Sequence, residues 1–131
     1  VFIEHWSNME DLRRAIAAGD LSTVRQLAGS FFSQRLGGFL PIHFAAAAKV
    51  NSSEMLSLLL GARADACAIT NETKQAVHFA AENANGKEAL QLLLTARAEV
   101  DARTRQARTP LHHAALAGVI DTARHLLAAG A

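Results

Sequence analysis

With 131 residues, the chain has the length of one domain, and half of its residues are hydrophobic, which is enough to build a sizeable core. The net charge of +1 gives no reason to expect nucleic acid or an anionic membrane as the partner of the whole chain. The single cysteine, Cys67, excludes an internal disulfide and favours an intracellular, cytoplasmic location. Neither an 18-residue apolar run nor a leader-like start is present, so we expect no transmembrane helix and no signal peptide.

Two helices are predicted in the N-terminal quarter of the chain. Ser7 followed by Glu10 is typical of a capping box that opens a helix, and Gly19 is a typical helix end. Asp20 is then expected to cap a second helix. The apolar residues of both segments recur at helical spacing.

Three later segments resemble one another. They are centred on His43, His78 and His112, which are 35 and 34 residues apart. Each is followed by a leucine-rich triplet, at 58–60, 92–94 and 125–127, the last of which begins with His125, with spacings of 34 and 33. Self-similarity at a fixed period of this length indicates a repeat architecture.

The last copy shows why each repeat forms two helices. Thr109 can cap the first helix through its hydroxyl, and Pro110 suits the first helical position, where a missing N–H costs nothing. Leu40 and Gln75 stand at the position of Thr109 in the other copies and supply no such cap. At the starts of the second helices, the pairs Asn51 with Glu54 and Asn85 with Glu88 predict further capping boxes.

Thr109-Pro110-Leu111-His112-His113-Ala114-Ala115, followed by Gly118 and Gly130, resembles an ankyrin repeat. This resemblance implies an all-α fold: an ankyrin-repeat solenoid of helix-turn-helix repeats with projecting β-hairpin-like loops. We expect one domain, residues 1–131, with repeats at about 7–34, 35–69, 70–103 and 104–131. The resemblance also implies that the repeated histidines bond the preceding turn and the neighbouring loop. Arg63 and Arg97 stand where the family has a helix-ending glycine.

The resemblance further implies that the chain is a protein-protein interaction module and not an enzyme, with no catalytic residue, cofactor or metal. The partner is expected to be another protein, with an acidic segment as one candidate, and neither nucleic acid nor membrane. The positions that match the family's contact surface are Leu36, Gly37, Phe39, Ala47, Ala48, Asn71, Glu72, Lys74, Glu82, Asn83, Arg103, Arg105, Gln106, Arg108, His113, Leu116 and Ala117. Two alternatives remain open: a regulatory or targeting arm of a larger enzyme, such as a kinase or ubiquitin ligase, and a purely structural spacer.

The residues themselves add two observations on function. His112 and His113 are adjacent, so on a helix they do not share a face and do not form a two-ligand metal site. Residues 102–131 carry four arginines and one acid, whereas residues 1–101 carry nine basic and eleven acidic side chains. Arg103, Arg105 and Arg108 fall in one predicted loop, where the alternatives are solvated charge and recognition of an acidic partner.

Overall fold

A computed structural model describes the backbone of residues 2–131 and the side chains of residues 9–29 and 32–131. Within this part the chain forms helices and loops, with two isolated β-bridges and no longer strand. The helices are α1 (Phe2–Ala18), α2 (Leu21–Phe31), α3 (Pro41–Ala47), α4 (Ser52–Gly61), α5 (Ala76–Glu82), α6 (Lys87–Thr95), α7 (Pro110–Ala117) and α8 (Ile120–Ala128). The all-α expectation is therefore confirmed.

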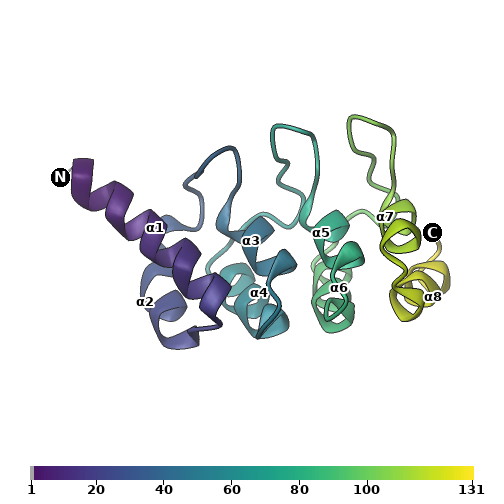
Figure 1. Cartoon of the computed structure of the whole chain (residues 1–131), viewed down its shortest axis with the longest axis horizontal. Helices are drawn as coiled ribbons and strands as arrows, with labels where there is room; N and C mark the ends of the chain where they lie inside the picture. Colours follow the sequence, from purple (N-terminus) through teal and green to yellow (C-terminus); the bar gives the residue numbers. More distant parts are fainter. Residues whose placement is uncertain (1) are drawn as a thin grey trace.

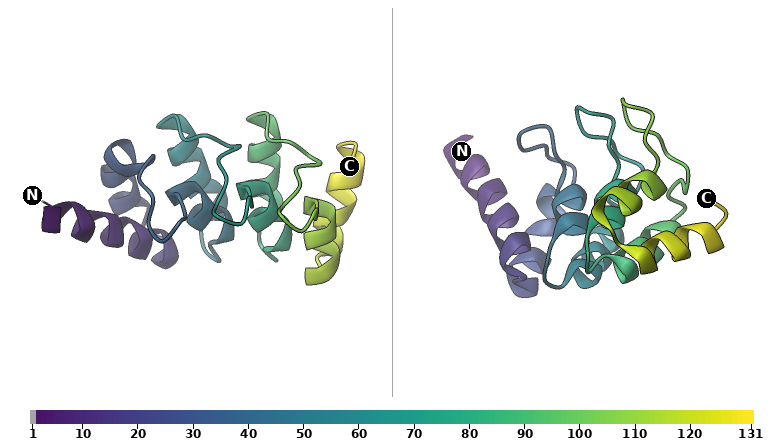
Figure 2. Two further views of the ribbon diagram at one scale, coloured as in Figure 1. Left: turned by 90° about the horizontal axis from the view of Figure 1, so that it is seen from above. Right: turned by 45° about the vertical axis from the view of Figure 1, so that its right-hand side comes forward.

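The helices are arranged as four successive pairs in a row (Figure 1). Each helix contacts its partner within the pair, and it also contacts the corresponding helix of the neighbouring pair, as α3 does with α5 and α4 with α6. Two layers result, one of odd-numbered and one of even-numbered helices, and the connecting loops project from one edge (Figure 2). This is the predicted solenoid, in which stacking of neighbours creates a continuous core.

Small residues pack the odd-numbered helices closely together. Ala45 and Ala46 of α3, Ala80 and Ala81 of α5, and Ala114 of α7 are all fully buried. The even-numbered helices fill the wider part of the core with large side chains. These are Met55, Leu56 and Leu59 in α4 and Leu90 and Leu93 in α6.

The predicted capping boxes are wrong. Helix α1 begins at Phe2 and runs through the 7–10 segment, and the Ser7 side chain lies outside the described residues. Asn51 precedes α4 without a side-chain cap, and its Nδ2 instead donates to the carbonyl of Gly19, at 3.0 Å. Gly86, not Asn85, precedes α6, and Asn85 Nδ2 donates to the Lys49 carbonyl, at 3.2 Å. The amides thus satisfy carbonyls left free at the helix ends of the preceding pair.

The projecting loops are hairpin-like, as expected. Leu36 and Phe39 form a β-bridge around a two-residue turn. In the next two loops the Thr70 N–H donates to the Lys74 carbonyl at 2.9 Å, and the Thr104 N–H donates to the Arg108 carbonyl at 3.0 Å. Each loop projects away from the helices and returns to the start of the first helix of its repeat.

Glycine at the ends of α4 and α6 is expected to stabilise the protein. Arg63 and Arg97 have φ of 73° and 68°, in the left-handed region that Gly130, with which they align, also adopts. An L-residue there costs about 1–2 kcal/mol relative to its preferred conformation. Glycine avoids this cost, but its greater freedom in the unfolded chain cancels part of the gain. We expect Arg63→Gly and Arg97→Gly each to raise the free energy of unfolding by about 1 kcal/mol in urea titrations.

The matched control is the reverse change at Gly118, which has a φ of 73° and no atom within 4 Å of an added Cβ. Because no clash intervenes, Gly118→Ala should lose a similar amount through φ alone. A neutral outcome at all three positions would contradict this account of the helix ends.

Candidate functional site

Two of the repeated histidines, His43 and His78, join neighbouring repeats. His43 Nδ1 accepts the Leu40 N–H at 2.9 Å, and His78 Nδ1 accepts the Gln75 N–H at 3.0 Å. Their Nε2 atoms therefore carry the proton and donate to carbonyls of the following loop, Ala68 and Ala102, each at 2.8 Å. Burial lowers the pKa of both imidazoles, so the rings stay neutral. The expected structural role is confirmed for His43 and His78, whereas among the described residues His112 bonds only the preceding turn, at Thr109.

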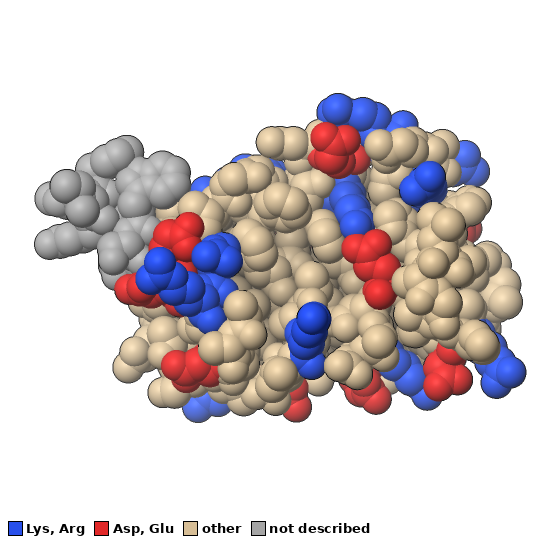
Figure 3. Space-filling model, viewed as in Figure 1, with Lys and Arg blue, Asp and Glu red and all other residues tan. Residues whose placement is uncertain are grey.

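Three rows of side chains run across the face formed by the odd-numbered helices and the bases of the loops. Each row contains one residue per repeat at equivalent positions of the period. We call these nine residues the front face: Phe39, Lys74 and Arg108; Phe44, Phe79 and His113; Ala47, Glu82 and Leu116. All nine are partly or fully exposed. The same side of the molecule is seen in Figure 3, where charged atoms gather around a mainly uncharged surface over α3.

Aromatic rings occupy the α3 end of the front face. The centroid of Phe39 lies 5.4 Å from that of Phe44 and 6.0 Å from that of Phe79. Lys74 Nζ lies 4.1 Å from the centre of the Phe79 ring, within cation–π range. Sequence reasoning missed Phe44 and Phe79. The available signal was that each directly follows a repeated histidine, at the position of His113.

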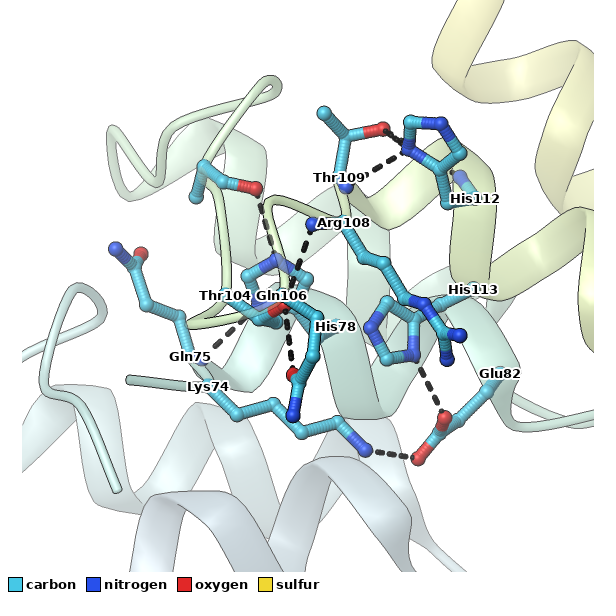
Figure 4. A network of polar contacts seen from close by, with 11 residues as sticks. Lys74, Gln75, His78, Glu82, Thr104, Gln106, Arg108, Thr109, His112 and His113 are labelled. Atoms are coloured by element: carbon cyan, nitrogen blue, oxygen red, sulfur yellow. Dashed lines mark hydrogen bonds and ion pairs between the residues drawn. The ribbon is translucent and has the colours of Figure 1, made fainter. Parts of the chain in front are cut away.

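A charged network crosses from α5 to α7 (Figure 4). Lys74 Nζ donates to Glu82 Oε1 at 2.6 Å, and Glu82 Oε2 lies 3.0 Å from His113 Nδ1. Burial tends to raise the pKa of Glu82, but the hydrogen bonds from Lys74 and His113 outweigh it and hold that pKa below its usual value. Nε2 of His113 is buried without a partner among the described residues. The positive charge of Lys74 therefore compensates the negative charge of Glu82 within the protein.

Hydrogen bonds join the loop tips to one another. Arg105 Nη2 donates to the Asn71 carbonyl at 2.7 Å, and Nη1 lies 3.9 Å from Glu72 Oε2. Arg105 is therefore already engaged by the neighbouring loop. Arg103 and Arg108 are exposed and form no ion pair within the described part of the chain, which leaves their charges open to solvent.

Most of the predicted contact residues reach the surface, and one does not. The exposed ones are Gly37, Ala47, Asn71, Glu72, Arg103, Arg105, Gln106, Arg108, Leu116 and Ala117. The half-buried ones are Leu36, Phe39, Lys74, Glu82, Asn83 and His113. Ala48 is 6% exposed and packs against the core, so its prediction as a contact residue is wrong.

Asn83 explains why Ala48 turns inward. Its Nδ2 donates to the carbonyls of Ala46 and Ala48, at 3.0 and 2.8 Å, and its Oδ1 accepts the Asn85 N–H at 3.0 Å. These bonds draw the end of α3 against the next repeat. They also use the polar atoms of Asn83 internally.

The described residues contain no group of three or more His, Cys, Asp or Glu side chains arranged to hold a metal. Cys67 is half-buried, and burial raises the pKa of its thiol, which disfavours the nucleophilic thiolate. None of the helices in the described residues is both long and apolar enough to cross a membrane.

Comparison with known proteins agrees with this geometry. A family model described as ankyrin repeats, in three copies, matches residues 12–104 and, in a second match, residues 42–131. A search of curated proteins found no match. Ankyrin repeats are generally protein-protein interaction modules and are typically not catalytic. Four stacked helix pairs, the interlocking histidines and the projecting loops show that this chain belongs to the ankyrin-repeat family.

Proposed function

We propose that the chain binds a partner protein through the front face and the adjoining loop tips. The observation that carries the proposal is that the three rows lie on one continuous face and are not consumed by stacking of the repeats. Leu116 is 70% exposed on α7, and the rings of Phe39, Phe44 and Phe79 are half-exposed. Apolar and aromatic side chains displayed beside charges are typical of protein interfaces.

We further propose that the α7 end of this face binds an acidic part of the partner. Arg103 and Arg108 are exposed and form no ion pair with the described residues, and an arginine can hold a carboxylate through two hydrogen bonds. Exposed charges of this kind mainly raise the rate of association, and salt screens them. A regulatory or targeting arm of a larger enzyme would use the same face, whereas a structural spacer would have no specific partner.

The test is affinity capture followed by titration of the captured protein against matched variants. Arg103→Ala/Arg108→Ala is expected to weaken binding about fivefold to thirtyfold at low salt and less at high salt, since each exposed contact contributes about 0.5–1 kcal/mol. The control is Gln91→Ala/Arg124→Ala, which alters exposed residues on α6 and α8. Loss of binding in the control alone would place the interface on the opposite layer. The absence of any saturable partner would favour the spacer.

A further inference from the structure

The front face changes its chemistry along the repeat axis. At α3 it presents two aromatic rings and Ala47, and at α5 a Phe79 ring beside the Lys74–Glu82 pair. At α7 it presents Arg108, His113 and Leu116. A partner that runs along this face therefore meets apolar surface at one end and positive charge at the other.

The aromatic end also has a hollow. Phe39 and Phe44 line a small, almost entirely apolar depression between α1, the first loop and α3. Leu12, Ile16 and Leu36 form other parts of its wall. A large apolar side chain placed here would cover the hollow and the exposed edges of the rings, which removes apolar surface from water.

The opposite end carries the free positive charge. Glu82 is held by Lys74 and His113, and Arg105 is turned to the Asn71 carbonyl and Glu72. Arg103 and Arg108 have no acid within ion-pair distance among the described residues. The positive charge of Arg103 and Arg108 is therefore available to a carboxylate of a binding partner.

We infer that the partner segment is extended and carries two anchors in a fixed register: a large apolar side chain for the α3 end and an Asp or Glu for the α7 end. Packed helices lie about 8–10 Å apart, so the rings at α3 and Arg108 beside α7, two helix steps apart, are separated by about 16–20 Å. An extended chain advances about 3.3 Å per residue, so this distance corresponds to about five to six residues from one anchor to the other. This inference rests on the proposed function and specifies what the face recognises.

A random 12-residue peptide library displayed on phage tests the register. Selection at low salt on the immobilised 131-residue chain is expected to enrich peptides with a large apolar residue and an acid about five to six positions apart. Synthetic versions of the enriched peptides should bind at least tenfold more weakly when either anchor is changed to alanine. Moving the acid two residues further away should have the same effect.

Charge reversal supplies the matched variant. Selection on Arg103→Glu/Arg108→Glu should exchange the acid for Lys or Arg and keep the apolar residue at the same distance. The control, Gln91→Glu/Arg124→Glu on α6 and α8, adds the same kind of charge to exposed positions of the other layer and should leave the enriched pattern unchanged.

The outcomes separate the register from the proposed function. Peptides that lose binding with Leu116→Arg or Arg108→Glu but lack a fixed apolar–acid spacing would overturn the register and keep the front face as the interface. Peptides sensitive only to the α6 and α8 control substitutions would overturn both. A library that yields no enriched peptide also contradicts the register.

Discussion

Replacing His78 by alanine is expected to lower the free energy of unfolding by about 2–5 kcal/mol. The ring is fully buried and joins two backbone groups, the N–H of Gln75 and the carbonyl of Ala102. Without the ring both groups lose their partner, at about 1–3 kcal/mol for each buried group left unsatisfied. The cavity left by the side chain adds to the loss. Urea titration followed by circular dichroism measures the change.

His112→Ala is the matched control, because His112 occupies the same position in the last repeat. Its Nδ1 also accepts the N–H of the capping residue, Thr109, at 3.0 Å. Its side chain is exposed, however, and its Nε2 makes no hydrogen bond to the described residues, so water can replace what is lost. We expect a loss of about 0.5–1.5 kcal/mol. Equal losses at the two positions would mean that the bond to the following loop contributes nothing.

Lowering the pH from 7.5 to 5.5 is expected to reduce the free energy of unfolding, by at most about 3 kcal/mol, the limit for two histidines that stay neutral in the folded protein. Burial holds the pKa of His43 and His78 below the ordinary value, which the same residues regain in the unfolded chain, near 6.5. Between these values the unfolded chain binds protons that the folded chain does not. The contribution of these two histidines to the free energy of unfolding is therefore fully present above about pH 6.5. It is lost as the pH falls, at about 1.4 kcal/mol per pH unit for each histidine that stays neutral in the folded protein.

Urea titrations at the two pH values measure this loss, and most carboxylates remain ionised in both conditions. His78→Gln should remove about half of the pH dependence. If that variant does not fold, NMR titration of the imidazole signals of the unaltered protein gives the two pKa values directly. A midpoint that is the same at both pH values, or histidines that titrate near 6.5 in the folded protein, would contradict the prediction.

The periodic features of the chain could be predicted because each copy supports the others. His43, His78 and His112 recur with the same neighbours, so one interpretation explained all three and also located the helix pairs. The alignment on that period also placed Arg63 and Arg97 at the position of a helix-ending glycine, and both have a positive φ, which no local propensity indicates. Periodicity carries this information because every repeat must present the same contacts to its neighbours.

Contacts between repeats explain why the predictions of capping boxes at Asn51 and Asn85 and of a contact role for Ala48 are wrong. Asn51 and Asn85 resembled local caps, but the Gly19 and Lys49 carbonyls of the preceding pair compete for their amides. The four-residue pattern of a capping box carries no information about these carbonyls of another repeat. Ala48 likewise turns inward because of bonds from Asn83, a residue of the next repeat.

The aromatic part of the candidate site was missed for a related reason. Phe44 and Phe79 follow the repeated histidines on short helices with many buried alanines, and an apolar residue in that context favours a core position. Only the contact of each ring with Phe39, from a loop, shows that the rings lie at the edge of the core and are half-exposed. The residue at the position of Phe39 differs in type from repeat to repeat, as Lys74 and Arg108 show, so the period does not predict this contact.

The links between neighbouring pairs also determine where folding can begin. Hydrogen bonds such as those from His43 to Ala68 and from Asn83 to Ala46 join residues 25 and 37 positions apart. Bonds of this kind reach only the next pair, so no pair depends directly on a distant part of the chain. Folding can therefore start at any pair and spread in either direction. A chain emerging from the ribosome can stack α1 to α4 before α7 has been synthesised.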